Sequence, residues 1–340
     1  MKKVVTLGEI MLRLSAPSYK RFVQSESFDV CYGGGEANVC VSLANYGLEA
    51  SFISKVPSNE IGQSAINALR RYGVHTQFIA RGGNRLGIYF LENGASQRAS
   101  KVIYDRANSS ISEADLSDFD WNEIFKDVDW FHFTGITPAL GDKAATITLE
   151  ACKKAKEMGL TVSADLNYRK KLWSPKKANE VMTKLMPYVD VCIGNEEDAE
   201  KTFGIKAKET DVQSGQINHN AYEEVAKELV NRFGFKYVAS TLRVSLSASD
   251  NGWSAMLYDG KQAYHSKKYD LRIVDRVGGG DSFASGLIYG LITDKSAQEA
   301  LEFAAAASAL KHSIPGDFNL VSLEEAEALS KGEGSGRVQR

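Results

Sequence analysis

The 340-residue chain is poor in cysteine and histidine, and their spacing excludes the common metal sites and disulfide frameworks. Its four cysteines are scattered and form no C-x-x-C pair, so neither a zinc site nor a disulfide-stapled fold is expected. The five histidines show no H-x-x-x-H spacing that would bind a metal. We interpret the cysteines, which lie mostly in apolar runs, as reduced core residues of a cytoplasmic protein.

Long apolar runs and an excess of one charge are also missing. No stretch of about 18 apolar residues occurs, so no membrane span or membrane partner is expected. The N-terminus begins M-K-K-V-V-T-L, but Glu9 and Arg13 interrupt the apolar run, which predicts a strand and not an export signal. The 41 basic and 43 acidic residues leave a net charge of −2, which argues against nucleic acid as the main partner.

The most informative stretch contains three consecutive glycines, Gly278, Gly279 and Gly280, followed by Asp281. The apolar pair at 273–274 before them predicts the end of a buried strand, and a helical pattern follows. Glycines at a helix start let several backbone N–H groups converge, and the helix dipole makes such a point a phosphate site. There Asp281 would accept the proton of a hydroxyl that attacks the phosphate. The alternative is a glycine turn whose aspartate only caps a helix.

A second glycine cluster, at 33–35, precedes another predicted helix that runs to about Tyr46. Its bare backbone, at Gly34 and Gly35, would let a small polar ligand lie against the helix start. Asn38 would then offer its amide to a ligand hydroxyl. A flexible turn before a helix explains the same residues equally well, so this cluster does not decide the function by itself.

From residue 128 onward, apolar strands alternate with amphipathic helices. Strands are predicted at 128–133, 161–164, 189–193 and 237–240, and helices at 143–158, 175–186, 196–203 and 222–233. Such alternation predicts an α/β fold with a mostly parallel sheet and helices on both faces. Ligands of these sheets bind beyond the carboxyl ends of the strands. Polar residues stand at those ends, either as ligand contacts or as ordinary loop residues: Asp165, Asn167, Arg169, Asn195, Glu196 and Glu197.

A predicted hairpin, with strands at 86–91 and 101–104, carries Tyr89, Tyr104 and Arg106. These side chains would contact a ligand if the hairpin covers a cleft, and would otherwise be surface residues. We predict a polar surface insertion at 206–220, a closing helix at 322–329, and a flexible tail at 332–340.

The two glycine clusters together resemble the two signatures of the PfkB (ribokinase-like) carbohydrate kinases. The first reads G-G-G-E-A-N-V-C-V-S-L-A-N-Y-G, and the second reads D-R-V-G-G-G-D-S-F-A-S-G against the family's D-T-x-G-A-G-D-x-F. The resemblance covers nearly the whole chain. Arg276 stands where the family has threonine, and Gly279 where it has alanine. The family's N-x-x-E motif ends here in Asp198, whose side chain is one methylene shorter than glutamate.

The resemblance implies a ribokinase-like, three-layer α/β/α fold in one domain (1–331), with a small β-sheet lid drawn from about 10–32 and 86–106. It implies transfer of the γ-phosphoryl of ATP, with Mg²⁺, to a sugar hydroxyl. Because such lids often pair between subunits, it also implies a homodimer, with Phe28, Val30 and Tyr32 as contact residues.

Within the family the chain is most similar to 2-keto-3-deoxygluconate kinases, which implies an acidic sugar. Arg106 and Arg169 would hold its carboxylate through charge-assisted hydrogen bonds. The implied catalytic residues are Asp281, Gly278, Gly279 and Gly280. The implied sugar contacts are Gly34, Gly35, Asn38, Tyr89, Tyr104, Arg106, Asn167, Arg169, Asp281 and Asp317. The implied nucleotide contacts are Asn195, Thr241, Arg243, the predicted turn at Gly252, Gly278, Gly280, Ala304 and Ala307, and magnesium would be held through water by Glu197 and Asp198.

Three other functions fit parts of the pattern. A kinase of another sugar, such as fructose or 2-keto-3-deoxygalactonate, would keep the glycine turn and Asp281. A catalytically inactive sugar sensor on the same fold would account for the departures at Arg276 and Asp198. A dinucleotide-dependent oxidoreductase is disfavoured, because V-G-G-G-D is not the G-x-G-x-x-G pattern.

Overall fold

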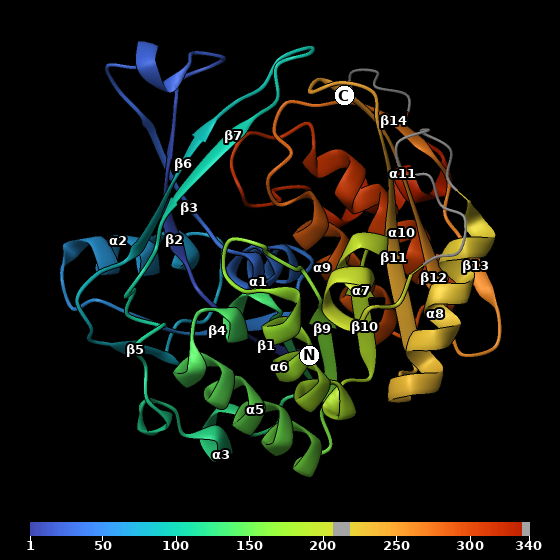
Figure 1. Cartoon of the computed structure of the whole chain (residues 1–340), viewed down its shortest axis with the longest axis horizontal. Coiled ribbons are helices and arrows are strands. Elements are labelled where there is room, and N and C mark those ends of the chain that lie inside the picture. Colours follow the sequence, from blue (N-terminus) through green and yellow to red (C-terminus); the bar gives the residue numbers. More distant parts are fainter. Residues whose placement is uncertain (207–217, 335–340) are drawn as a thin grey trace.

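Two unequal β-sheets form the framework of the molecule (Figure 1). The computed structural model describes residues 1–206 and 218–334. Most of the predicted insertion at 206–220 and of the predicted tail at 332–340 therefore lies outside the described residues.

The larger sheet has ten strands in the order β13-β12-β11-β10-β9-β8-β1-β4-β5, with β14 also paired to β12. From β5 to β11 the neighbours are parallel, and β12, β13 and β14 add antiparallel partners. Short apolar runs build the parallel part because both of its faces are covered. The strands are β1 (Lys3–Leu7), β4 (Glu49–Val56), β5 (Ile79–Arg81), β8 (Trp130–Thr134), β9 (Thr161–Asp165), β10 (Val191–Gly194), β11 (Tyr237–Ser245), β12 (Asp250–Tyr258), β13 (Ala263–His265) and β14 (Tyr269–Arg272).

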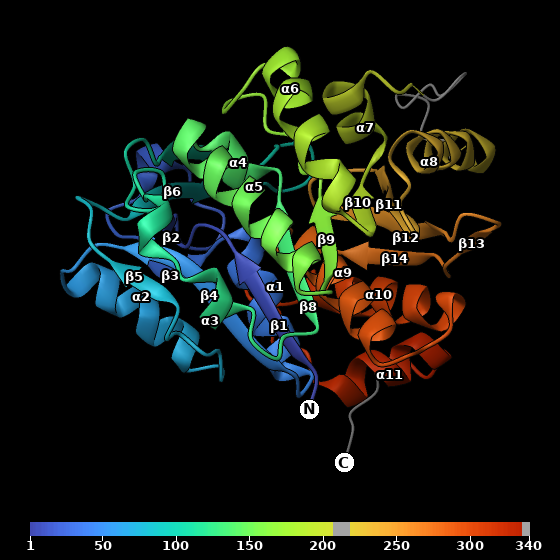
Figure 2. The ribbon, with the colours of Figure 1, turned by 90° about the horizontal axis from the view of Figure 1, so that it is seen from below.

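Helices cover both faces of this sheet, as Figure 2 shows from below. One apolar core packs α1, α2, α9, α10 and α11 against one face, and a second packs α5, α6, α7 and α8 against the other. The α/β prediction with three layers is thereby confirmed. The helices are α1 (Gly35–Asn45), α2 (Glu60–Arg70), α3 (Trp121–Ile124), α4 (Ile136–Ala139), α5 (Asp142–Glu157), α6 (Pro175–Leu185), α7 (Glu196–Phe203), α8 (His219–Phe233), α9 (Gly279–Ile292), α10 (Ala297–Lys311) and α11 (Leu323–Lys331), with short 3₁₀ turns at Phe22–Gln24, Leu116–Asp118 and Met186–Tyr188.

The smaller sheet has four strands in the order β3-β2-β6-β7. They are β2 (Met11–Ser15), β3 (Asp29–Gly33), β6 (Gly87–Glu92) and β7 (Lys101–Asp105). Strand β2 runs parallel to β6, and the other pairs are antiparallel. Alternate residues of β2 and β6 are buried, as expected where only one face of a sheet is covered. The predicted lid segments, 10–32 and 86–106, supply all four strands.

Two local predictions are wrong. The pair Ile273 and Val274 does not end a strand: β14 stops at Arg272, and Val274 is 46% exposed. The N–H of Ile273 still donates to the carbonyl of Ser249, next to β12, whereas the N–H of Val274 donates to the carbonyl of His312, so the chain leaves the sheet at this pair. Gly252 does not lie in a turn, because it sits inside β12 and is paired with both β11 and β14.

Within the part of the chain that the structure describes, no helix is long and apolar enough to cross a membrane.

Candidate active site

A cleft between the two sheets gathers most of the predicted site residues. It lies beyond the carboxyl ends of β9, β10 and β11, as expected for an open α/β sheet. Its volume of about 1680 Å³ exceeds that of a pocket for one small ligand. The predicted residues that line it are Gly34, Gly35, Asn38, Tyr89, Tyr104, Arg106, Asn167, Arg169, Asn195, Glu197, Asp198, Thr241, Arg243, Gly278, Gly280, Asp281 and Asp317.

The glycine turn at the start of α9 forms the floor of the cleft. Gly278 has a φ of 83° in the left-handed region, and a Cβ there would lie 2.1 Å from the carbonyl oxygen of Asp317. A Cβ on Gly279 would lie 2.5 Å from the ring of His312, whereas Gly280 opens to the cleft. The turn therefore needs glycine, and the first N–H groups of α9, which lack intrahelical partners, border the cleft.

Asp281 joins the two glycine clusters, which are far apart in the sequence. Its Oδ2 accepts a hydrogen bond of 2.6 Å from the side-chain amide of Asn38, 243 residues earlier. Gly35 lies beside the same carboxyl group, because a Cβ there would be 3.6 Å from Oδ1. Burial raises the pKa of Asp281 to about 6, and the Asn38 amide opposes this rise. Asp281 is thus ionised at neutral pH and placed to accept a proton.

A buried arginine of the lid, Arg13, connects the lid to the turn. Its guanidinium donates to Oδ1 of Asp317 at 2.7 Å and to Oδ2 of Asp275 at 2.5 Å. The hydroxyl of Tyr89, also on the lid, donates to Oδ2 of Asp317 at 2.5 Å. Asp275 in turn accepts from the N–H of Val277, in the segment that leads into the glycine turn. This network fixes the lid relative to the glycine turn.

Sequence reasoning missed Arg13 as a functional residue. The signal was present, because β2 alternates and Arg13 stands in the inward-facing row with Met11 and Ser15. A charged residue in such a row needs a buried partner. Which carboxylates provide it, 262 and 304 residues away, is not visible in the local pattern.

The two arginines predicted to hold a carboxylate have different surroundings. Arg106 forms a buried ion pair with Glu9, a residue that sequence reasoning also missed. Oε1 of Glu9 and Nε of Arg106 have no hydrogen-bond partner in the described structure. Arg169 is exposed in the cleft, donates to the carbonyl of Tyr168, and forms no ion pair with any described residue. The charge of Arg169 acts on the buried carboxylates of Asp198, Asp165 and Asp281 and opposes the rise of their pKa values, but no close ion pair keeps this side chain from a ligand in the cleft.

The acidic residues at the ends of β9 and β10 are held by backbone contacts. Asp198 accepts from the N–H groups of Tyr168 at 2.9 Å and Asn195 at 3.1 Å. Burial raises the pKa of Asp198 to about 6, and burial together with Asp198 and Asp281 raises the pKa of Asp165 well above its usual value. No group of three metal-ligating side chains occurs among the described residues. This donor set fits a magnesium ion that is carried mainly by phosphates and water.

Three predicted nucleotide contacts do not reach the cleft. Ala304 and Ala307 are fully buried in α10. A Cβ on Gly286 of α9 would lie 2.7 Å from the Cα of Ala304, so these small residues serve the close packing of two helices. Gly252 faces Lys268 and Val244 within the sheet. Gly279, predicted as catalytic, lies behind the surface of the turn, against His312.

The comparison with known families settles the kinship of the chain. The model of the pfkB family of carbohydrate kinases matches residues 1–320. The chain belongs to the PfkB family of carbohydrate kinases.

Several relatives of known name resemble this PfkB chain over almost its full length. A crystal structure of 2-dehydro-3-deoxygluconokinase from Thermotoga maritima is 54% identical, covers 98% of this chain and 100% of its own, and superposes with a TM-score of 0.95. A 2-dehydro-3-deoxygalactonokinase from Haloferax volcanii is 32% identical and covers 98% of both chains. A 2-dehydro-3-deoxygluconokinase from Bacillus subtilis is 27% identical, over 93% of this chain and 91% of its own.

The structure shows where two departures from the PfkB pattern, Asp198 and Arg276, lie. Asp198 lines the cleft although its side chain is shorter than glutamate. Arg276 borders the cleft beside the glycine turn and donates to the carbonyl of Ala248 at 3.2 Å. Neither departure removes the turn, Asp281 or Asn38 from the site.

Proposed function

We propose that the protein transfers the γ-phosphoryl group of ATP to the terminal 6-hydroxyl of 2-keto-3-deoxygluconate, giving 2-keto-3-deoxy-6-phosphogluconate and ADP. The family and the 54% identity to an enzyme named 2-dehydro-3-deoxygluconokinase support the reaction type and the substrate. The observation that carries the proposal is the placement of Asp281 at the glycine turn, in the same cleft as an unpaired Arg169.

The chemistry follows from the contacts of Asp281. Its carboxylate, aligned by Asn38, accepts the proton of the attacking hydroxyl as the new bond to phosphorus forms. The backbone N–H groups at the start of α9 stabilise the charge that develops on the transferring phosphoryl group. Magnesium, when bound with the nucleotide, neutralises further charge on the phosphate oxygens, and Asp198 and Glu197 would orient its water ligands.

Recognition of the acidic sugar is assigned to the lid side of the cleft. Arg169 is assigned as the primary anchor for the carboxylate, because it is exposed in the cleft and forms no ion pair with an acidic side chain among the described residues. Arg106 is already paired with Glu9, so together they suit a hydroxyl group, which both donates and accepts. Tyr104 lies under the guanidinium of Arg106, 5.5 Å from its ring centroid, and borders the same space.

The lid also supports a homodimer. Phe28 and Val30, next to and within β3, are 38% and 62% exposed, and Ile103 of β7 is 54% exposed. These residues give an outward surface of the small sheet an apolar character that a second copy of the lid would cover. Water is excluded from the phosphoryl group when such a lid closes.

The experiment that tests the function is an ADP-release assay with Mg-ATP and a panel of acceptors. The panel contains 2-keto-3-deoxygluconate, its galactonate epimer, fructose, ribose and gluconate. We expect selective turnover of 2-keto-3-deoxygluconate. Preferred turnover of the galactonate epimer would favour the second candidate, which the Haloferax volcanii relative supports. Turnover of a neutral sugar would contradict the carboxylate anchor, and sugar binding without turnover would indicate a sensor.

Two variants sharpen the substrate assignment. Arg169→Gln should raise KM for the acidic sugar by about 10- to 100-fold, since a hydrogen bond to a charged group contributes about 1.5–3 kcal/mol. It should change KM for ATP little. Arg106→Gln should raise KM for the acidic sugar less than Arg169→Gln does, because Arg106 is already paired with Glu9 and is assigned to a hydroxyl group. Equal effects of both variants on all acidic sugars would contradict the division of roles.

A further inference from the structure

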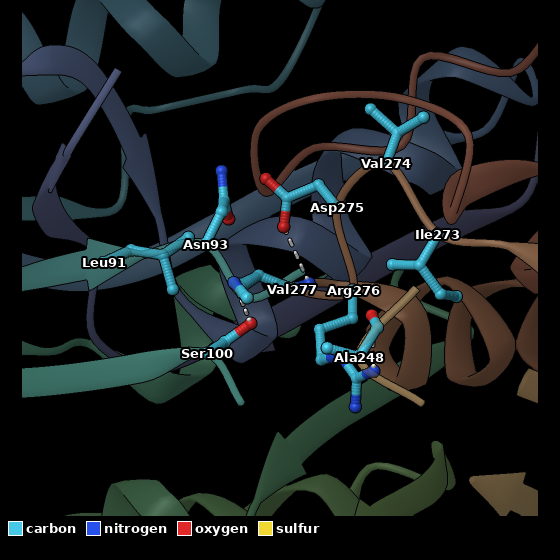
Figure 3. A pocket seen from close by; sticks show the side chains of 10 residues that line it. Leu91, Asn93, Ser100, Ala248, Ile273, Val274, Asp275, Arg276 and Val277 are labelled. Atoms are coloured by element: carbon cyan, nitrogen blue, oxygen red, sulfur yellow. Dashed lines mark hydrogen bonds between the residues drawn. The ribbon is translucent and has the colours of Figure 1, made fainter. Parts of the chain in front are cut away.

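Two arginines on the nucleotide side of the cleft have no acidic partner. Arg276 stands two residues before Gly278 and is half-buried, and Arg243 lies on β11 with its side chain exposed. Both line the cleft. Figure 3 shows Arg276 beside Ala248, whose carbonyl accepts its hydrogen bond at 3.2 Å. Neither arginine forms an ion pair with a carboxylate in residues 1–206 or 218–334.

The like charges of these two arginines act on each other. Burial and the charge of Arg243 together lower the pKa of Arg276. His312 adds no positive charge here, because burial lowers its pKa to about 4, and the ammonium of Lys311 donates to the carbonyl of Ile314. Asp275, the closest acid in the chain, is engaged by Arg13. Two guanidinium groups that repel each other and line the same cleft favour a bound anion beside them.

We propose that Arg276 and Arg243 together hold the phosphate chain of the nucleoside triphosphate, next to the glycine turn that holds the transferring phosphoryl group. The proposal rests on the proposed kinase function and adds to it a residue that the PfkB pattern does not supply. Guanidinium groups bind phosphate oxygens through two parallel, charge-assisted hydrogen bonds. The arginines thus secure the part of the nucleotide that stays behind as ADP.

The position of the pair favours phosphate over the carboxylate of the sugar. Arg243 lies on β11 together with Thr241, which is an expected nucleotide contact. The expected sugar contacts Asn38, Tyr89 and Arg106 lie elsewhere, on α1 and the lid. The carboxylate of the sugar is already assigned to Arg169, which lies in the cleft but outside β11 and the glycine turn.

The contact of Arg276 with Ala248 also connects the proposed phosphate-binding arginines to the lid. The N–H of Ala248 donates to the carbonyl of Ser96 at 2.8 Å, and the N–H of Ser96 donates to the hydroxyl of Ser249 at 3.0 Å. Ser96 lies in the connection between β6 and β7 of the lid. Figure 3 shows lid residues, Asn93 and Ser100, facing the segment that carries Arg276. The loop that orients Arg276 is thus the loop that the lid touches.

The test measures nucleotide binding without any sugar, by titration calorimetry with Mg-ATP, Mg-ADP and AMP. Arg276→Gln and Arg243→Gln should each weaken ATP binding about tenfold or more, as expected for loss of a charge-assisted contact. The affinity for AMP, which carries only one phosphate group, should fall much less. Arg276→Lys should recover part of the ATP affinity. The matched control is Arg71→Gln, a surface arginine at the end of α2, which should bind all three nucleotides as the unaltered protein does.

Two outcomes would overturn the proposal: unchanged ATP affinity in both variants, or equal losses of affinity for ATP and AMP. If Arg276→Gln does not fold, the exposed Arg243 carries the same test. Because no sugar is present, an error in the proposed sugar substrate leaves this result unaffected.

Discussion

The large sheet and the small sheet are built by different rules and contribute different parts of the site. Strand β8 of the large sheet is buried at all five positions, because helices cover both faces. Strand β2 of the small sheet buries only alternate residues. The large sheet and its helices provide the glycine turn, Asp281 and Asp198, whereas the small sheet provides Tyr89 and Arg13. In the proposed function the large sheet and its helices hold the groups of the phosphoryl transfer, whereas sugar recognition is shared between Arg169, which follows β9, and Tyr89 and Arg106 of the lid.

Arg13 is the point at which this division breaks down. It belongs to the lid by sequence, yet both of its carboxylate partners, Asp275 and Asp317, belong to loops beside the glycine turn. The side chains of all three are at most 4% exposed. The comparison therefore predicts separable effects on chemistry and on recognition, with an exception where the two regions share one ion network.

The largest expected effect tests the chemical half of the comparison. Asp281→Asn should lower kcat by about 10²–10⁴-fold, because it removes the base while keeping the shape of the side chain. The affinities for ATP and for the sugar should stay close to those of the unaltered protein. Steady-state kinetics and nucleotide titration measure both. Asp294→Asn, an exposed carboxylate just beyond the other end of α9, is the matched control. An unchanged kcat would exclude Asp281 as the base.

The second largest effect is expected at the ion network of Arg13, which joins the small sheet to the loops beside the glycine turn. Arg13→Met should lower the free energy of unfolding by about 3–5 kcal/mol, because it leaves two buried carboxylates without their partner. It should also raise KM for the sugar, since Asp317 and Tyr89 lose their alignment. Urea unfolding gives the stability. The control is Arg21→Met, a lid arginine whose side chain is 48% exposed. If Arg13→Met lowers the free energy of unfolding no more than Arg21→Met does, Arg13 does not fix the lid.

A pH titration sharpens the assignment of the base. The folded pKa of Asp281 is raised to about 6 by burial, and only the ionised carboxylate accepts a proton. Activity should therefore be present above about pH 6 and fall about tenfold for each pH unit below it. The measurement is kcat/KM between about pH 8 and about pH 5. The residual activity of Asp281→Asn should fall less steeply, because the base is gone, although Asp198, whose pKa is also raised to about 6, still titrates in this range. A flat profile in the unaltered protein would contradict the assignment.

The smallest effect on catalysis is expected on the outer side of the lid. Val30→Asp places a charge on the exposed apolar surface proposed to pair with a second copy, so the dimer should dissociate. Light scattering after gel filtration measures the mass, and kcat should change little because Val30 points away from the chemistry. Leu116→Asp, on an exposed apolar residue in a short turn outside the lid, is the control. An unchanged mass for Val30→Asp would remove the lid from the interface.

Local features of the sequence were enough to predict the layered α/β fold and the glycine turn that begins α9, whose role as a phosphate site stays a prediction. Strand and helix periodicities are short-range properties, and consecutive glycines before a helix favour an anion site because their backbone N–H groups are accessible. The prediction failed at Ile273 and Val274 because apolar character alone does not distinguish a strand from a loop segment that bonds to a distant carbonyl. It failed at Ala304 and Ala307 because small residues pack helices closely as readily as they border a ligand.

By itself, the sequence determined which residue types the site contains and where its two glycine clusters begin helices. Only the tertiary structure decided which charges meet. Strand register and the faces that distant segments turn toward one another decide that Glu9 pairs with Arg106 and that Arg13 binds Asp275 and Asp317. Electrostatic contacts depend on distances in space, and these are set only when the two sheets come together around the cleft.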